Sequence, residues 1–253
     1  PIEKIREYID WTFFFKAWQM RGTYPRIIND PVKGKVAKEL FKNANKMLEE
    51  IIENKVLQAN VAYGFWPANS EKNDIILYKE KNESEELTRF NMLRQRKLKS
   101  GIALSLSDFI APKDTKIKDY IGAFAVTAGI KAEKLAEKYE ENNDDYNSIM
   151  VKTLADRLAE ALAELMHQRV RKEWGFPDDG KITNDDLIKE KYRGIRPAFG
   201  YPACPNHEEK IKLFDILEAK KIGMNLTENY SMMPAASVSG LYFANQNAKY
   251  FSV

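Results

Sequence analysis

Residues 196–207, RPAFGYPACPNH, gather several side-chain types that proteins use in chemistry. They include the only cysteine, Cys204, and one of the two histidines, His207, in Cys-x-x-His spacing. A structural zinc site needs four ligands, so this pair could form one only with partners from elsewhere in the fold. Prolines flank Cys204 instead of a helix N-terminus that would lower the pKa of a nucleophile. The residue types therefore favour a small buried cysteine over a metal ligand or a nucleophile.

The backbone of the same loop is shaped by Pro197, Pro202 and Pro205, each of which fixes φ and removes an N–H donor. Gly200 permits a positive φ or the close approach of a bulky group. A rigid, extended segment of this kind loses little entropy when a ligand orders it. Its unpaired carbonyls and amides could bind that ligand. A stiff connector between two helices explains the same residues, so both interpretations stay open on chemistry alone.

Composition and charge argue against several classes of function. Apolar residues make up 44% of the chain and charged residues 30%, which is typical of a soluble globular protein. The 40 basic and 37 acidic residues are interleaved and leave a net charge of +3, which argues against nucleic-acid and membrane-surface partners. No Gly-x-Gly pair occurs, so the dinucleotide fingerprint and the phosphate loop are absent.

Compartment and completeness can also be predicted. No apolar run approaches the roughly 18–20 residues of a membrane-spanning helix. The charged start, PIEKIREYIDW, is unlike a signal peptide, and one cysteine cannot form an internal disulfide. We therefore expect a cytoplasmic protein. Because the chain of 253 residues begins with Pro1 rather than methionine, we also expect a piece of a longer polypeptide.

Apolar periodicity and capping residues predict four helices. In the second, Ser84 is the candidate N-cap, and acidic residues follow in the first turn. Gly175 is a natural end for the third, and Asn206 and Gly223 bound the fourth. The predicted helices cover residues 36–52, 84–97, 147–174 and 207–222.

Strand-like runs lie between these helices, and the charged stretch 137–147 is typical of a loop or boundary. Because several of the runs are adjacent in sequence, the pattern predicts an α+β fold with a largely antiparallel sheet. The predicted strands cover residues 56–66, 74–79, 102–110, 120–128 and 236–244.

The stretch R-P-A-F-G-Y-P-A-C-P-N-H resembles the R-x-x-x-G-Y-P-A-C-P-x-H signature of the activation domain of cobalamin-dependent methionine synthase. The resemblance extends over nearly the whole chain, and we interpret residues 1–253 as one such domain with its C-terminal end truncated. The other similar blocks are IDWTFFFKAWQMRGTYP (9–25), YGFWPANS (63–70), LSDFIAP (106–112), DYIGAFAVTAG (119–129), HQRVRKEWGF (167–176) and ASVSGLYFANQNAKYF (236–251).

The resemblance implies a fold and an activity. The fold is a bent antiparallel sheet surrounded by helices in a single C-shaped domain. The family's domain binds S-adenosylmethionine and remethylates cob(II)alamin, carried by an adjacent module, after a flavodoxin or related flavoprotein supplies an electron. This chain lacks the D-x-H-x-x-G motif of a cobalamin-binding module, so we expect it to bind S-adenosylmethionine without completing the methylation cycle. A non-catalytic docking or sensing module for a corrinoid protein is the alternative.

The resemblance also carries functional positions onto matching residues. It assigns no catalytic side chain and no metal ligand. Glu190, just before the signature, is a further candidate outside the main set. The expected S-adenosylmethionine-binding residues are Asp10, Glu160, Arg196, Tyr201, Tyr250 and Phe251.

The chemistry of the ligand suits these residue types. Arg196 could bind the carboxylate through two parallel hydrogen bonds. Asp10 could pair with the ammonium or favour the sulfonium, and Tyr250 could face the cationic end. Each has an ordinary structural interpretation as well: Asp10 as a helix N-cap, Arg196 in a surface ion pair and Tyr250 in packing. Glu160 could be one charge on a solvated helix face.

A surface for the corrin ring is a further hypothesis, with Phe199, Tyr201, Met232 and Met233 as its members. Three positions depart from the family pattern. Phe13 and Phe199 stand where proline is common, which affects local loop shape. Phe251 replaces a frequent second tyrosine, so a hydroxyl is lost there. His167 on the long helix is most simply a structural residue.

Overall fold

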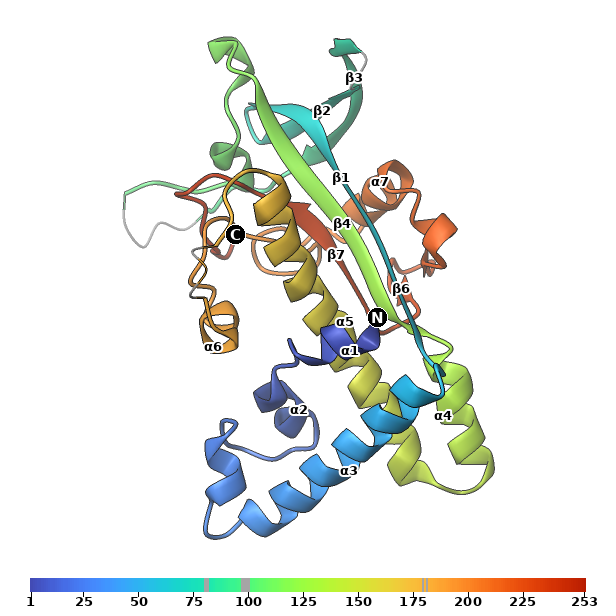
Figure 1. Ribbon diagram of the computed structural model, residues 1–253. Coiled ribbons are helices and arrows are strands. Elements are labelled where there is room, and N and C mark those ends of the chain that lie inside the picture. The colour runs from blue at the N-terminus through green and yellow to red at the C-terminus, as the bar shows by residue number, and fades with distance from the viewer. Residues whose placement is uncertain (80–81, 97–100, 179, 181) are drawn as a thin grey trace. The chain divides into compact units, whose positions relative to one another are not determined.

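Five of the described strands form one sheet in the order β3-β2-β1-β4-β7 (Figure 1). The computed structural model describes residues 1–79, 82–96, 101–178, 180 and 182–253. Strand β2 pairs antiparallel with both β1 and β3. The predicted α+β fold with a largely antiparallel sheet is confirmed. The strands of the sheet are β1 Gln58–Glu71, β2 Asp74–Lys79, β3 Asn82–Asn91, β4 Asp119–Ile130 and β7 Ser237–Tyr242.

Helices and short 3-10 turns make up most of the remaining regular structure. Within the described residues, no helix is both long enough and apolar enough to span a bilayer. The α-helices are α1 Ile2–Arg6, α2 Trp11–Ala17, α3 Gly34–Glu53, α4 Ala132–Glu141, α5 Asp145–Glu173, α6 Asn184–Ile188 and α7 Glu209–Ile216. The 3-10 helices are η1 Arg26–Asn29, η2 Leu106–Phe109, η3 Lys113–Thr115 and η4 Ala219–Ile222, and two short strands are β5 Asn225–Leu226 and β6 Met232–Met233.

The chain divides into two compact units. Helix α5 and strands β1, β4 and β7 contribute residues to both. Unit 1 comprises Pro1–Asn60, Val126–Met166 and Met232–Val238, and unit 2 comprises Val61–Ala125, His167–Ser231 and Ser239–Val253.

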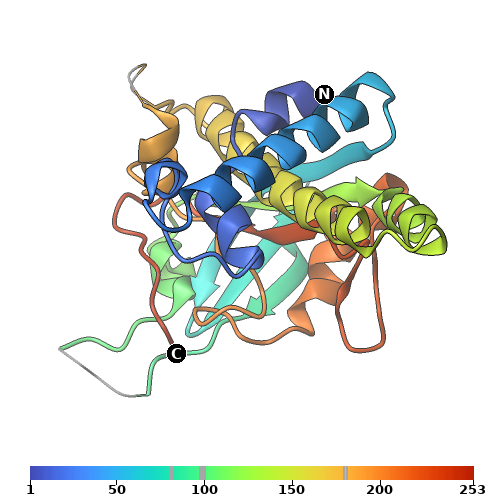
Figure 2. The same ribbon diagram turned by 90° about the horizontal axis from the view of Figure 1, so that it is seen from below.

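Unit 1 is built around α3, which lies beside the first part of α5 (Figure 2). One face of α3 is buried through Ala37, Leu40, Ala44 and Leu48, the spacing expected of an amphipathic helix. The prediction of a helix over 36–52 is therefore confirmed. The amide Nδ2 of Asn43 donates to the Tyr146 hydroxyl at 3.0 Å and joins the two helices.

Unit 2 contains β2, whose Ile75, Ile76 and Leu77 are fully buried. The predicted helix over 84–97 is wrong, because residues 82–91 form β3 along the edge of β2, with Ile75 opposite Phe90. Pairing with a buried strand outweighs the local helix signals. Residue 97 lies outside the described part of the chain.

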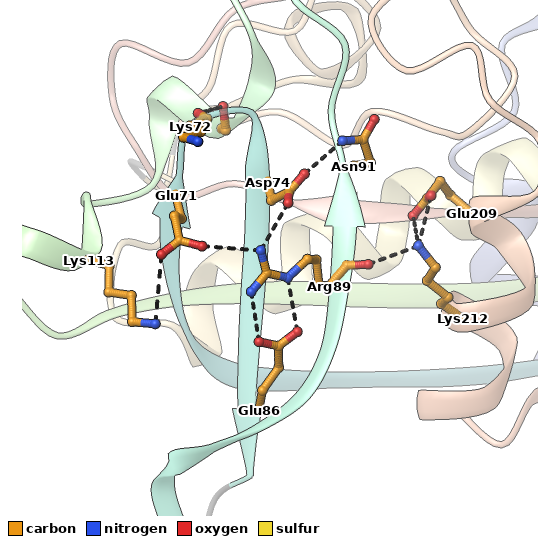
Figure 3. A network of polar contacts seen from close by, with 10 residues as sticks. Glu71, Lys72, Asp74, Glu86, Arg89, Asn91, Lys113, Glu209 and Lys212 are labelled. Carbon is orange, nitrogen blue, oxygen red and sulfur yellow. Dashed lines mark hydrogen bonds and ion pairs between the residues drawn. The ribbon is translucent and has the colours of Figure 1, made fainter.

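A polar network on the outer strands of unit 2 shows how β3 is held (Figure 3). The guanidinium of Arg89 donates to Glu71, Asp74 and Glu86, at 3.2, 3.0 and 2.9 Å, and so bridges β1, β2 and β3. Hydrogen bonding to Arg89 holds the pKa of Glu86 below its usual value. These side chains are all partly exposed to solvent, so each pair contributes modestly to stability.

Three other sequence predictions need correction. Residues 102–110 are not a strand: Ser105 makes one isolated bridge, and the capping box of Ser105 and Asp108 starts η2 instead. The stretch 137–147 is mostly helical, because α4 and α5 meet at a turn of only a few residues. The helix over 207–222 is broken, because Glu218, with a φ of 49°, lies between the end of α7 and the start of η4.

The remaining elements agree with expectation. Helix α5 confirms the long helix over 147–174, and Gly175 follows it with a φ of 91°, a conformation that favours glycine. Strand β2 coincides with the predicted 74–79. Strands β1, β4 and β7 confirm the other predicted runs, with β1 extending further along the chain than expected.

Candidate functional site

The signature loop, residues 196–207, is a closed turn in unit 2 rather than the extended segment expected from its prolines. Gly200 has a φ of 98°, and its amide donates to the carbonyl of Cys204 at 2.9 Å. The amide of Cys204 returns a bond to the carbonyl of Tyr201 at 3.0 Å. The positive φ favours glycine, and a Cβ on Gly200 would also lie 2.2 Å from Cε1 of the exposed His207 ring.

Cys204 is buried in this turn, and its thiol donates to the carbonyl of Ala198 at 3.1 Å. Burial raises the pKa of Cys204 to about 12, so the thiol stays protonated and is a poor nucleophile. Cys204 is only 4% exposed, which agrees with its interpretation as a small buried residue. Among the residues that the structure describes, no group of three or more His, Cys, Asp or Glu side chains is placed to hold a metal ion.

His207 lies on the outside of the turn and is held by Lys210. The Lys210 ammonium is buried and lies 2.9 Å from Nδ1 of His207 and 3.1 Å from the carbonyl of Tyr230. An ammonium at this distance donates to Nδ1 when that nitrogen carries no proton. Burial also lowers the pKa of Lys210.

Arg196, the first residue of the signature, is fixed at both its backbone and its side chain. Its amide donates to the hydroxyl of Tyr250 at 3.0 Å. Its side-chain NH1 donates to the hydroxyl of Tyr192 at 2.6 Å and lies 3.3 Å from Nδ1 of His167. The structure therefore brings together Arg196 and Tyr250, two of the residues expected at the site.

His167 is buried behind Arg196 between two tyrosine rings. The ring of Tyr242 stacks on it at 5.2 Å, and Tyr192 meets it edge-on at 5.0 Å. Burial first, and then the positive charges of Arg196 and Arg171, hold the pKa of His167 well below its usual range. The imidazole is therefore neutral at physiological pH.

Arg171, one helical turn after His167, completes this group. Its guanidinium lies 3.9 Å from the centre of the Tyr192 ring, a cation–π geometry. It also makes a two-point ion pair with Asp178, at 2.7 and 2.6 Å, and both side chains are almost fully buried. The i, i+4 spacing of His167 and Arg171 was visible in the sequence, but nothing there indicated Tyr192 or Asp178.

Tyr250 and Phe251 line a hollow of about 1010 Å³ in unit 2. Tyr250 is 44% exposed, whereas Phe251 packs edge-on against Phe109 at 6.3 Å. Other lining residues are Gln95, Arg96, Ile102, Leu104 and Lys249. The mixture of apolar walls and two cationic side chains suits a ligand with an anionic group.

The residues expected on the corrin-facing surface differ in how far they are exposed to solvent. Tyr201 is 62% exposed, as a docking residue must be. Phe199 is buried, because its ring stacks on Phe90 of β3 at 5.5 Å, so its assignment to that surface is wrong. Met232 and Met233 belong to unit 1, where Met233 is exposed.

Asp10 and Glu160 also belong to unit 1. Asp10 is the N-cap of α2, and its carboxylate accepts from the amide of Thr12 at 2.8 Å. Glu160 lies on α5 and is half-buried. Arg196, Tyr201, Tyr250 and Phe251 belong to unit 2, and Glu190 is exposed there just before the loop.

Comparisons with known proteins place these features in a family. The model of the family described as "Vitamin B12 dependent methionine synthase, activation domain" matches residues 1–253. A solved structure, the crystal structure of the MetH reactivation domain bound to AdoHcy, is 49% identical to this chain. The similarity covers 99% of this chain and 78% of that one, with a TM-score of 0.96.

Proposed function

Because this chain belongs to the family of activation domains of vitamin B12-dependent methionine synthase, we propose that it binds S-adenosylmethionine and supports reductive methylation of cobalamin. The observation that carries the proposal is Arg196, whose backbone amide donates to the hydroxyl of Tyr250 and whose guanidinium donates to Tyr192, in a chain 49% identical to a domain solved with AdoHcy. AdoHcy is the product that remains when S-adenosylmethionine gives up its methyl group.

Arg196 binds the ligand carboxylate in this proposal. A guanidinium presents its N–H groups in a planar arrangement that matches a carboxylate with two hydrogen bonds. The contacts of NH1 with Tyr192 and His167 hold the guanidinium in one orientation, so little side-chain entropy is lost on binding.

The other expected residues have complementary roles. Asp10 and Glu160 supply carboxylates that pair with the ammonium or favour the sulfonium. Tyr250 and Phe251 supply aromatic faces, and a cation–π contact contributes roughly 0.5–2 kcal/mol depending on desolvation. Tyr201 is the exposed signature residue that meets the cobalamin module.

The methyl transfer depends mainly on how the bound ligand is oriented. Cobalamin, held by another module and reduced by one electron from a flavodoxin or related flavoprotein, accepts the methyl while the S–CH₃ bond breaks and leaves S-adenosylhomocysteine. Sulfonium is an excellent leaving group, so the chain's own residues need only bind the ligand and direct its methyl outward. No side chain has to transfer a proton, which agrees with the protonated thiol of Cys204 and the neutral ring of His167.

Calorimetry tests the binding step. Titration of S-adenosylmethionine into the chain should show one site, and Arg196→Ala should weaken binding about 10- to 100-fold, the range for lost hydrogen bonds to a charged group. Arg169→Ala is the matched control, because Arg169 is an exposed arginine of the same unit paired with Glu173. Unchanged affinity in Arg196→Ala would remove Arg196 from the site.

A reconstitution tests the methyl transfer. The chain is mixed with a cob(II)alamin-loaded module, reduced flavodoxin and S-adenosylmethionine, and methylcobalamin is followed by its absorbance. Product that depends on the chain supports the reactivation function. Ligand binding without product would show a docking or sensing module instead.

A further inference from the structure

We propose that Tyr192 and His167 are positioning residues that orient Arg196 and make the site selective for ligands with a carboxylate. The inference rests on the proposed binding of S-adenosylmethionine. Neither residue touches the ligand in this proposal, and both act through the guanidinium of Arg196.

The first support is the hydrogen-bond geometry at NH1 of Arg196. This nitrogen carries two N–H groups, and it lies 2.6 Å from the hydroxyl of Tyr192 and 3.3 Å from Nδ1 of His167. With one N–H directed to each acceptor, the guanidinium plane has little freedom to rotate. A carboxylate then meets the guanidinium in an orientation that Tyr192 and His167 have already set.

The second support is the protonation of His167. Nδ1 accepts from Arg196 only when the ring is neutral and carries its proton on Nε2. The ring is buried between the rings of Tyr192 and Tyr242, and the cations around it are Arg196 and Arg171. All of these conditions disfavour protonation of the His167 ring, so Nδ1 stays an acceptor.

The third support is the rigidity of Tyr192. Its ring lies between the edge contact with His167 and the guanidinium of Arg171, 3.9 Å from the ring centre. Arg171 is in turn held by the two hydrogen bonds that it donates to the carboxylate of Asp178 in a buried ion pair. The hydroxyl that meets Arg196 is therefore presented by a ring that cannot swing away.

The test measures affinity for two ligands by calorimetry: S-adenosylmethionine and its decarboxylated analogue. Tyr192→Phe removes one hydroxyl and keeps the ring under Arg171. We expect it to weaken S-adenosylmethionine about ten-fold, as for one lost hydrogen bond to a charged group, with less than about two-fold effect on the analogue. In an Arg196→Ala background, the same change should have no further effect on either ligand.

His167 is tested by a pair of variants. His167→Asn keeps an acceptor near the position of Nδ1, and His167→Leu removes it. The asparagine variant should retain most of the preference for the carboxylate ligand, and the leucine variant should lose it. Tyr120→Phe, at an exposed tyrosine of the same unit, is the control for loss of a hydroxyl. Thermal unfolding by circular dichroism confirms that each variant is folded.

The outcomes distinguish failure of the positioning role from failure of the proposed function. If the unaltered chain binds neither ligand, the proposed function fails and the inference fails with it. If the chain binds both ligands and Tyr192→Phe weakens them equally, or weakens neither, the proposed function stands and the positioning role is overturned.

Discussion

The hydroxyl of Tyr250 accepts a hydrogen bond from the backbone amide of Arg196 at 3.0 Å, across 54 positions of sequence. This bond fixes the first residue of the signature loop to the last aromatic segment of the chain. The side chain of Arg196 is oriented separately by Tyr192 and His167. The backbone and the guanidinium are thus held by different partners, and each can be removed alone.

Tyr250→Phe removes the backbone anchor and keeps the aromatic face. We expect the free energy of unfolding to fall by about 1 kcal/mol, the usual value for one hydrogen bond. Affinity for S-adenosylmethionine should fall with it, because Arg196 is less well placed. Urea unfolding and calorimetry measure the two effects, with Tyr120→Phe as the control. Unchanged values in both measurements would mean that the bond has no role in solution.

Gly200→Ala tests the steric requirement of the turn. The added Cβ would lie 2.2 Å from Cε1 of His207, at a φ of 98°. We expect a loss of roughly 1–3 kcal/mol in unfolding free energy. Gly175→Ala is the matched control, because its φ is also positive, at 91°, and no atom lies within 4 Å of the new Cβ. Equal losses in the two variants would show that backbone strain alone is responsible.

Protonation of His167 should make stability depend on pH. The pKa of the folded ring is lowered, mainly by burial, whereas an unfolded histidine titrates near 6.5. Below about pH 6.5 the unfolded state therefore binds more protons, and the unfolding free energy falls as pH falls, by at most about 1.4 kcal/mol per pH unit. Above about pH 7 this contribution is fully present. Unfolding free energies of the unaltered chain and of His167→Asn, measured between about pH 7.5 and 5.5, isolate the contribution of His167. Parallel pH profiles of the two proteins would contradict the prediction.

The thiol of Cys204 should be unreactive in the folded protein. Its pKa is raised to about 12 by burial, so almost no thiolate exists at pH 8. We expect labelling by Ellman's reagent to be about a hundred-fold slower or more than in urea, where the thiol returns to a pKa near 8.5. Rapid labelling of the native chain would show that the signature loop opens readily.

Asp178→Asn tests the ion pair behind Tyr192. Arg171 would then be a buried charge without its carboxylate, and removal of one partner from a buried pair typically costs about 3–5 kcal/mol. Thermal and urea unfolding measure the loss. Asp185→Asn is the control, because Asp185 pairs with Lys189 at the surface, where its side chain is 69% exposed. A loss no larger than in the control would mean that water reaches Arg171.

Sequence reasoning located the elements whose signals are local. Helix α3 follows from its apolar spacing, and β2 follows from a short apolar run bounded by turn residues. It failed at β3, because the partner that makes residues 82–91 a strand is β2, and pairing between strands is not encoded in either segment alone. The break in the helix over 207–222 depends on one left-handed residue, Glu218, which has no compositional signal.

The candidate site was predictable only in part. Arg196 and Tyr250 were expected from the resemblance, and the structure brings them into contact. Tyr192 and Asp178 lie outside the signature and acquire their roles through contacts with Arg196 and Arg171. Such contacts depend on tertiary packing, so no spacing rule within the sequence could have indicated them.

Two consecutive residues of β3 contact the signature loop and the helix that follows it. Phe90 stacks on Phe199 of the loop, and the carbonyl of Arg89 accepts from Lys212 of α7 at 2.9 Å (Figure 3). The loop that carries Tyr201 is therefore braced by a strand more than 100 positions earlier in the chain as well as by its own prolines. A displacement of β3 would therefore be passed to the loop through the contact between the rings of Phe90 and Phe199.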